Sequence, residues 1–195
     1  MTALPKPKMT LEEYFELDNT AEGRYEYFDG QVFELSGTSP EHAIIGSTVG
    51  RLLGNQLAVR GCLVYSSEVR LKVPKLPPYR YADASALCGA PIYEEINHLD
   101  CLVNPTLLVE VLSPSTAAFD QGEKFTGYKS IPSFCEYLLI AQDKKRVVRY
   151  LKQAERFWLQ SEYYAGEIVP IESLGCELDV DALYQGINFE SETGF

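Results

Sequence analysis

A single acidic residue inside a strongly apolar segment places the tightest limit on how this chain can fold. Residues 107–112 read LLVEVL, a run typical of a strand that is buried on both faces. Glu110 interrupts this run, and a carboxylate that loses its water is destabilising unless a partner compensates for it. We therefore interpret Glu110 as a metal ligand or a catalytic acid.

The segment that follows this strand contains a second group of chemically useful side chains. Residues 113–116, SPST, stop the strand and offer an N-cap for a helix. Asp120 and Lys124 then lie four residues apart, which places them on one helical face. The spacing alone leaves two interpretations open, an exposed ion pair or a functional pair that acts together with Glu110.

The length and net charge of the chain indicate its number of domains and the partners it can bind. A chain of 195 residues is expected to form one compact domain. We expect a flexible lead-in over residues 1–9, the domain over residues 10–170 and an acidic tail over residues 171–195. The net charge of −11 counts against a tight DNA-binding surface. Nine of the 28 acidic residues lie after Ala154, however, so the acidity is concentrated at the C-terminal end.

The sequence carries no targeting segment and no cysteine framework. The first ten residues, MTALPKPKMT, lack the apolar core of a secretory signal, and no stretch is long enough to span a membrane. We therefore expect a cytoplasmic protein. The five cysteines are odd in number and scattered, without CxxC spacing, so we expect neither a zinc site nor a disulfide framework.

The order of helix and strand patterns indicates a mixed α and β fold. A capping box at Thr10 starts a short helix that ends near Leu17. A longer helix runs from Ser39 to Gly61, and residues 89–103 are expected to form a surface loop. A β-hairpin is expected over 24–28 and 31–35 around Asp29-Gly30, with further strands at 63–65, 69–73, 80–88, 134–140, 146–152 and 156–160.

A second acidic residue, Asp83, lies among small apolar residues in the expected strand 80–88. Two carboxylates on neighbouring strands can bind one divalent cation, for which Mg²⁺ or Mn²⁺ is suited. A nearby lysine such as Lys124 can orient or deprotonate the attacking water and offset negative charge on phosphorus. The alternative is structural, with the two acids satisfied by Arg70, Arg80 or tyrosine side chains.

Two further polar residues have a simple structural interpretation. Glu26 alternates with Tyr25 and Tyr27 in the first strand of the hairpin, which favours a solvent-facing side chain. His42 lies in the first turn of the long helix, where a lone histidine is usually a surface residue. The chain contains two histidines and no P-loop, Rossmann or G-x-S-x-G motif, so those classes of enzyme are disfavoured.

Taken in order, several motifs resemble the Uma2 family, also called DUF820. They are YEYFDGQVFELSGTSPEH, SSEVRLKV, YRYADASAL, NPTLLVEVLSPST and FDQGEKFTGYKSIPSFCEYLLI. The resemblance extends from about Thr10 to Trp158. Members of this family are predicted endonucleases, abundant in cyanobacteria, of the PD-(D/E)XK restriction-endonuclease-like superfamily. The resemblance implies an α+β fold with a central mixed sheet flanked by helices and an N-terminal β-hairpin.

The resemblance also assigns roles to individual residues. Asp83 takes the place of the aspartate in the PD motif, with Ala82 instead of the proline. Glu110 takes the place of the acid in (D/E)XK, but Leu112 stands where that motif has its lysine. The resemblance passes the role of this lysine to Lys124. Glu26, His42 and Asp120 match further motif positions as secondary site residues.

The function implied by the resemblance is a Mg²⁺- or Mn²⁺-dependent endonuclease that hydrolyses DNA. Asp83 and Glu110 would bind the metal, and Lys124 would complete the catalytic set. An alternative from another class is a catalytically degenerate member that serves as a binding or interaction module. A homodimer is compatible with either function.

Overall fold

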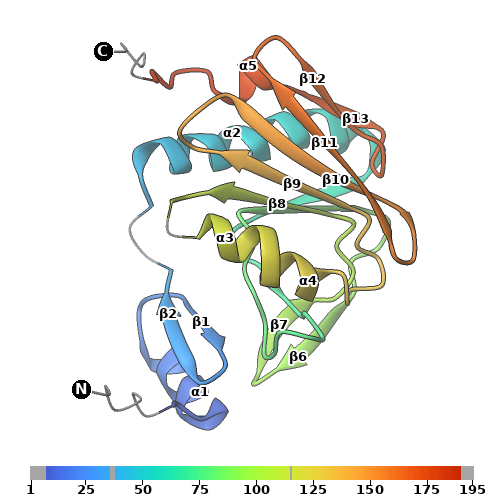
Figure 1. Ribbon diagram of the computed structural model, residues 1–195. Coiled ribbons are helices and arrows are strands. Elements are labelled where there is room, and N and C mark those ends of the chain that lie inside the picture. The colour runs from blue at the N-terminus through green and yellow to red at the C-terminus, as the bar shows by residue number, and fades with distance from the viewer. Residues whose placement is uncertain (1–7, 36–37, 115, 190–195) are drawn as a thin grey trace.

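The centre of the computed structural model, which describes residues 8–35, 38–114 and 116–189, is a mixed β-sheet of six strands (Figure 1). Strands β8 and β9 are parallel, and the other neighbours in the sheet are antiparallel. In spatial order the strands are β11 (Phe157–Tyr164), β10 (Arg146–Ala154), β9 (Glu136–Ala141), β8 (Leu107–Leu112), β5 (Ala84–Cys88) and β3 (Cys62–Ser66).

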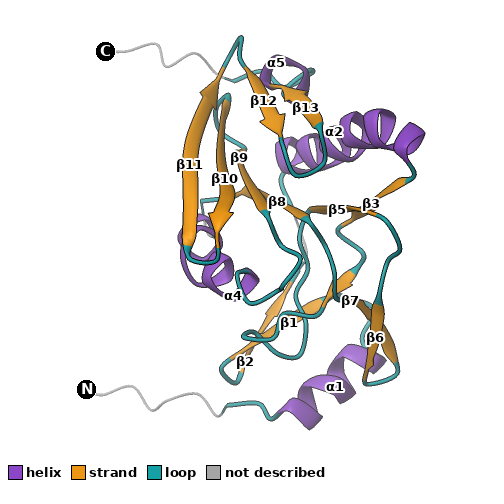
Figure 2. Ribbon diagram, turned by 90° about the vertical axis from the view of Figure 1, so that its right-hand side faces the viewer, coloured by secondary structure: helices purple, strands orange, loops and turns teal. Residues whose placement is uncertain are grey.

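Different layers cover the two faces of this sheet (Figure 2). Leu107, Val109 and Val111 of β8 pack in one core with the apolar face of α2. Leu108 packs in a second core on the opposite face, with Phe125 and Tyr128. Because side chains alternate along a strand, Glu110 points to this second face. The layer on the first face consists of α2 (Pro40–Leu57), β12 (Ile168–Ile171), β13 (Cys176–Asp179) and α5 (Val180–Leu183). The layer on the second face contains α3 (Ala117–Phe119), the π-helical turn η2 (Asp120–Lys124) and α4 (Phe125–Tyr128).

The N-terminal module lies beside the sheet and is formed by α1 (Leu11–Thr20), β1 (Tyr25–Phe28) and β2 (Gln31–Glu34) (Figure 1). Thr10 caps α1 in a capping box with Glu13, as the sequence predicts. Asp29 and Gly30 form the hairpin turn with φ angles of 45° and 81°, which an Asp-Gly pair accommodates. An aromatic cluster of buried residues joins this module to the rest of the chain: Tyr14, Tyr79, Tyr81 and Cys101.

The expected fold class and the long helix are confirmed. The helix α2 starts after the N-cap Ser39, and the short η1 (Ala58–Arg60) follows it and ends at Gly61. Gly61 has a φ of 67°, a left-handed conformation that favours glycine. None of the helices in the described ranges is both long and apolar enough to cross a membrane.

The expectation of a surface loop over residues 89–103 is wrong. This region forms a second hairpin, β6 (Tyr93–Ile96) and β7 (Leu99–Leu102), and β7 pairs in parallel with β4 (Arg70–Leu71). The turn at Asn97 and His98 has positive φ angles but no glycine, and the acidic residues of β6 mask the strand pattern. The usual hairpin signals are therefore absent from the sequence.

The packed part of the chain continues beyond residue 170, where we expected an acidic tail. Val180 and Leu183 are fully buried, and Tyr184 is 2% exposed, in the core beneath α2. The side chain of Asp179 caps α5 by accepting hydrogen bonds from two backbone amides. This acidic region therefore contributes a few apolar side chains to the core. The domain boundary expected at residue 170 was too early, because it was based on charge alone.

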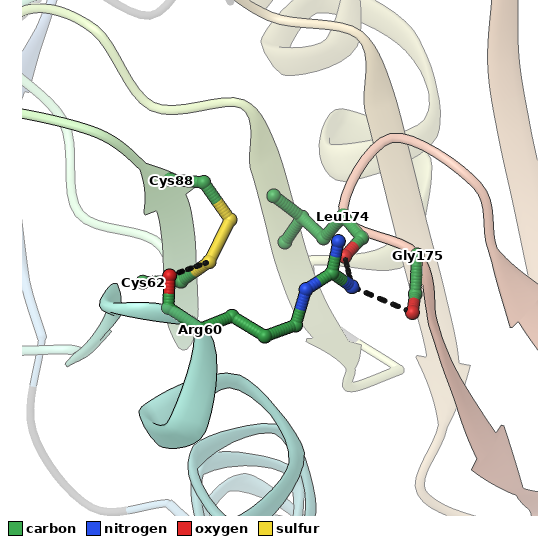
Figure 3. The surroundings of a disulfide bond; sticks show 5 residues. All are labelled: Arg60, Cys62, Cys88, Leu174 and Gly175. Carbon is green, nitrogen blue, oxygen red and sulfur yellow. Dashed lines mark hydrogen bonds between the residues drawn. A yellow bond between two sulfur atoms is a disulfide. The ribbon is translucent and has the colours of Figure 1, made fainter.

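Cys62 and Cys88 form a disulfide bond, which corrects the expectation that no cysteines pair (Figure 3). The two residues lie directly opposite each other in the β3–β5 ladder, with 4.1 Å between their Cα atoms. A separation of 26 residues conceals this register in the sequence. Next to the disulfide, Arg60 donates to the carbonyl oxygens of Leu174 and Gly175 and ties the end of η1 to the β12–β13 turn.

Candidate active site

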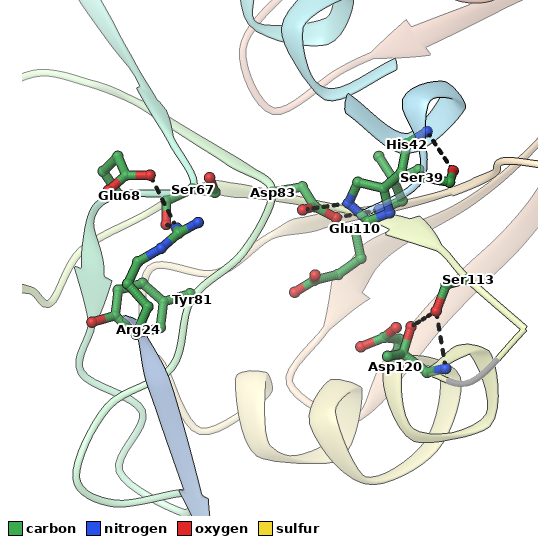
Figure 4. A network of polar contacts seen from close by, with 12 residues as sticks. Arg24, Ser39, His42, Ser67, Glu68, Tyr81, Asp83, Glu110, Ser113 and Asp120 are labelled. Atoms are coloured by element: carbon green, nitrogen blue, oxygen red, sulfur yellow. Dashed lines mark hydrogen bonds and ion pairs between the residues drawn. The ribbon is translucent and has the colours of Figure 1, made fainter. Parts of the chain in front are cut away.

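A cleft of about 920 Å³ opens at the end of the central sheet. The side chains of Asp83, Glu110 and Asp120 approach it from the bend before β5, from β8 and from η2 (Figure 4). Of the six residues singled out in the sequence, five line the cleft: His42, Asp83, Glu110, Asp120 and Lys124. The structure therefore brings together residues that are up to 82 positions apart in the chain.

Asp83 is held in place by the end of a β-ladder. Backbone pairing between β5 and β8 ends at Ala84 and Val109. Beyond that point the N–H of Val111 donates to Asp83 Oδ2 at 2.6 Å, so the side chain continues the ladder where the backbone of β5 leaves it. The other oxygen, Oδ1, lies 2.9 Å from Nε2 of His42. Both contacts fix the carboxylate at the wall of the cleft.

Glu110 is a buried glutamate, 4% exposed, whose side chain meets the segment 117–128. Lys124 Nζ lies 2.9 Å from its Oε1 atom. The hydroxyl of Tyr128 donates to the same oxygen at 2.7 Å. Since Lys124 and Tyr128 are one helical turn apart, a single short segment supplies both donors to Glu110.

Lys124 and Asp120 are not the exposed ion pair that spacing alone permitted. Their side chains are 8% and 5% exposed, and Lys124 Nζ lies 3.6 Å from Asp120 Oδ1. Both residues belong to η2, a π-helical turn. Such turns are rare and often occur at functional sites, because the wider turn changes the direction in which side chains project.

The charges in this group influence each other strongly. Burial raises the pKa of Glu110 well above its ordinary value; Lys124 opposes that rise, and the carboxylates of Asp120 and Asp83 add to it. Burial lowers the pKa of Lys124, but Glu110, Glu26 and Asp120 outweigh this effect and raise the pKa well above its ordinary value. Lys124 is therefore cationic at neutral pH, among acids that repel one another.

His42 faces the cleft and is not a free surface residue. The side chain of Ser39 caps α2 by accepting from the backbone N–H of His42, which orients the first turn of the helix (Figure 4). The His42 side chain is 14% exposed and meets Asp83. Burial lowers the pKa of His42, but the hydrogen bond and charge of Asp83 outweigh it, and the pKa is raised.

Glu26 lies behind the cleft wall. It is 7% exposed, so the solvent-facing interpretation is wrong. Its Oε1 atom accepts from the backbone N–H of Tyr81, two residues before Asp83, and its charge reaches Lys124. Glu26 therefore joins the hairpin to the segment that carries Asp83, without being one of the residues that line the cleft.

The structural alternative is met in one part: the hydroxyl of Tyr128 donates to Glu110, but among the described residues no arginine neutralises either acid. Arg70 pairs with Asp18 at 3.5 Å, and Arg80 donates to the carbonyl oxygen of Tyr79. In the described ranges, neither arginine forms an ion pair with Asp83 or Glu110. The space between the two acids therefore remains part of the cleft.

The donor set of the cleft suits a hard divalent cation. Among the described residues, no three His, Cys, Asp or Glu side chains already stand close enough to hold a metal ion. Mg²⁺, however, retains several waters and often uses only one or two carboxylates. Asp83 and Glu110 provide such a pair, and the repulsion between them and Asp120 is what a bound cation would relieve. The residues therefore fit this group.

Two residues of the site were missed in the sequence. No role in the site was predicted for Tyr128, although its spacing of four from Lys124 places both on one helical face. Arg24 lines the cleft and donates to the carbonyl oxygen of Ser67, while its guanidinium lies 3.1 Å from Glu68 (Figure 4). No local signal in the sequence marks Arg24, because its position depends on how the hairpin packs.

Comparison with known proteins agrees with this fold. The model of the Uma2 family, described as "Putative restriction endonuclease", matches residues 11–181. The crystal structure of "a putative nuclease belonging to DUF820" from Anabaena variabilis has a TM-score of 0.71 to this chain. It is 19% identical and covers 90% of this chain and 97% of its own, which shows a shared fold.

Two proteins of Synechocystis sp., both named uncharacterized, are similar along nearly their whole length. One, slr1290, is 31% identical over 185 residues, which are 95% of this chain and 96% of the relative. The other, sll1609, is 33% identical over 164 residues, 84% of this chain and 92% of the relative. Together with the family match, these relatives show that the chain belongs to the Uma2 family.

Proposed function

We propose that this protein is a divalent-metal-dependent endonuclease that hydrolyses phosphodiester bonds of DNA in the cleft. One observation carries the proposal: Asp83 from the bend before β5, Glu110 from β8 and Lys124 from η2 line the same cleft. The family and the similar protein from Anabaena variabilis, both described as nucleases, support the same class of reaction. Two carboxylates can hold the cation, and a lysine can offset the negative charge that develops on phosphorus.

Asp83 and Glu110 would hold the cation. When bound, a divalent cation offsets charge on a phosphoryl oxygen and lowers the pKa of a water ligand. The protein contributes by fixing the two carboxylates beforehand, Asp83 through Val111 and His42, and Glu110 through its donors from the segment 117–128. Groups fixed in advance need not reorganise when charge develops in the transition state.

Lys124 would act as a fixed positive charge. Its carboxylate neighbours raise its pKa well above the ordinary value, so the ammonium group does not release a proton at neutral pH. It therefore suits stabilisation of negative charge on the phosphate and orientation of the attacking water, and not removal of a proton from that water. Of the two roles that the sequence left open for this lysine, we favour the electrostatic one.

DNA is the proposed substrate, and binding is expected to be weak at high salt. Arg24 and Lys124 are the Lys or Arg residues among those that line the cleft in the described ranges. The N-terminus of α2, with its partial positive charge, also opens on the cleft through Ser39 and His42. With few phosphate contacts and a net charge of −11, affinity depends on a small number of groups.

A binding module without catalysis is the second candidate. The observation that favours it is that Asp83, Glu110 and Asp120 each already have a basic protein partner. His42 contacts Asp83, and Lys124 contacts both Glu110 and Asp120. A polar network that is satisfied internally can serve to specify the fold.

Calorimetric titration of Mn²⁺ combined with plasmid nicking distinguishes the two candidates. The wild type is compared with Asp83→Asn and with Asp100→Asn, a control that removes an exposed carboxylate outside the cleft. The proposal predicts Mn²⁺ binding and nicking by the wild type and the control, and loss of both in Asp83→Asn. Binding without nicking would support the second candidate. Absence of binding by the wild type, with and without an oligonucleotide, would overturn the metal-dependent mechanism.

A further inference from the structure

The hydroxyl of Tyr128 makes a contact with the cleft that the proposed chemistry does not use directly. It donates to Glu110 Oε1 at 2.7 Å and lies 3.4 Å from the carbonyl oxygen of Tyr81. The ring is fully buried, so Tyr128 does not reach a substrate itself. Any effect on the reaction must therefore pass through Glu110.

Packing leaves the Tyr128 ring little freedom to move. It makes edge-on contacts with Phe134 and Tyr137, with ring centroids 5.9 Å and 5.7 Å away. Both of these rings are themselves fully buried in the core under the segment 117–128. Because cores are close-packed, the hydroxyl is a fixed point in the structure.

The two carboxylate oxygens of Glu110 differ in their hydrogen-bonding partners. Both hydrogen-bonding partners described for this side chain, Lys124 and Tyr128, contact Oε1. Glu110 also lines the cleft, so the carboxylate is anchored by one oxygen while the other remains for a ligand from the cleft. A carboxylate that binds a metal through one oxygen is commonly held by hydrogen bonds in this way.

We propose that Tyr128 is a positioning residue that fixes the Glu110 carboxylate for a divalent cation. The inference rests on the proposed function, because it assigns Tyr128 to the same metal site. A neutral hydroxyl is suited to this role, since it fixes the orientation of the carboxylate without adding a positive charge that would compete with the cation. Lys124 contacts the same oxygen and supplies the positive charge, and Tyr128 fixes the orientation of the Glu110 carboxylate.

The test uses Tyr128→Phe, which keeps the ring and removes only the hydroxyl. The matched control is Tyr14→Phe, which also removes a fully buried hydroxyl, one that donates to the carbonyl oxygen of Tyr25 and contacts no carboxylate of the cleft. Mn²⁺ affinity is measured by calorimetry, and nicking is measured over a range of DNA concentrations. Melting in EDTA shows whether the two variants lose similar stability.

Tyr128→Phe is expected to weaken Mn²⁺ binding and to lower kcat by about 10- to 100-fold, with KM for DNA unchanged. Tyr14→Phe is expected to match the wild type in both measurements. A Tyr128→Phe protein with wild-type Mn²⁺ affinity and kcat would overturn the inference and leave the proposed function intact. A wild type that binds no Mn²⁺ would instead overturn the proposed function.

A second variant covers the case in which Tyr128→Phe does not fold. A 3-fluorotyrosine placed at position 128 alone keeps the ring and the hydroxyl and changes the strength of the donor. It is expected to alter Mn²⁺ affinity without altering KM for DNA. An affinity equal to that of the wild type in this protein would overturn the role of Tyr128.

Discussion

Glu110 on β8 and Glu136 on β9 are both buried glutamates, and they lie on neighbouring parallel strands. They point to opposite faces of the sheet, since Glu110 lies beside the segment 117–128 and Glu136 shares the other face with Leu138 and Ile140, beneath α2. Each one has a buried basic partner, Lys124 or Arg149. Burial and charge pairing are therefore common to both acids.

The two acids differ in how completely their oxygens are used. Glu136 Oε1 pairs with Nε of Arg149, and Oε2 accepts from the backbone N–H and the hydroxyl of Ser173 at 3.0 Å and 2.6 Å. Arg149 also contacts Glu172 at 3.1 Å. Glu136 is thus satisfied on both oxygens, and it is not among the residues that line the cleft.

This comparison shows that burial of an acid does not identify a functional site. A buried carboxylate with both oxygens satisfied fixes the structure, as Glu136 does by joining β9 and β10 to the turn before β13. Glu110 instead has donors on one oxygen and two like-charged neighbours, Asp83 and Asp120. An incompletely satisfied carboxylate that meets other acids in a cleft is the arrangement that a cation would stabilise.

The largest expected difference concerns activity. Glu110→Gln should reduce metal-dependent plasmid nicking by at least about 10²-fold, because an amide neither neutralises nor fixes a divalent cation as a carboxylate does. Glu136→Gln should leave the nicking rate per folded molecule unchanged. The check is a nicking assay well below the melting temperature of both variants. Equal losses in the two variants would remove the functional distinction between these acids.

The second difference concerns stability. Glu136→Gln should lower the free energy of unfolding by about 3 kcal/mol, because it removes the buried partner of Arg149 and leaves only Glu172, whose side chain is 61% exposed. Glu110→Gln should cost less, since Lys124 retains Asp120 and Glu26 nearby and the repulsion among the acids is reduced. Urea unfolding in EDTA measures both values. A larger loss in Glu110→Gln would contradict the structural role given to Glu136.

Addition of Mn²⁺ should distinguish the Glu110 site from the Glu136 site through the stability that a variant of each site regains. Lys124→Met removes the cation that competes with Mn²⁺ for Glu110 and Asp120, so at one fixed concentration Mn²⁺ should stabilise this variant more than it stabilises the wild type. Arg149→Met exposes no acid to the cleft, so Mn²⁺ should raise its stability only as much as that of the wild type. Thermal melting with and without Mn²⁺ tests this, and equal rescue of both variants would argue against a metal site at Glu110.

The smallest expected effect is a pH dependence of the free energy of unfolding, which should arise from His42 in the cleft. The folded-state pKa of His42 is raised, so its contribution to stability is present below about 6.5 and is lost as the pH rises through the folded-state value. His42→Asn should therefore reduce the free energy of unfolding more at pH 6 than at pH 9, in EDTA. His98→Asn, at a side chain that is 91% exposed, is the control. A pH-independent difference would contradict the pairing with Asp83.

The pattern of the sequence was sufficient for the main elements and for the acids of the cleft. Alternation and turn residues predicted the hairpin at Asp29-Gly30, the helix after Ser39 and the strand that holds Glu110. Lys124 was a candidate from its residue type and position, and the resemblance to the family favoured its functional role, because spacing could not tell an exposed pair from a buried one. The structure brings these side chains to one cleft, and their catalytic roles stay a prediction.

What the sequence did not reveal depends on contacts between distant segments. The same reasoning that selected Glu110 would have selected Glu136, because neither residue shows in sequence which of its oxygens is satisfied. The pairing of Cys62 with Cys88 depends on the register of two strands. The role of Tyr128 depends on the direction in which a π-helical turn presents its side chain. Local patterns contain none of this information.

The separate aromatic cluster of the N-terminal module has a consequence for spectroscopy. The single tryptophan, Trp158, lies on β11 and packs with Phe125 and Phe134, in the core beneath the segment 117–128. The cluster around Tyr14 contains tyrosines and no tryptophan. Tryptophan fluorescence therefore reports on the sheet and is insensitive to local opening of the hairpin that carries Glu26 and Arg24. A fluorescence melting curve would remain unchanged while that wall of the cleft separates, and only tyrosine-sensitive probes or hydrogen exchange would detect the event.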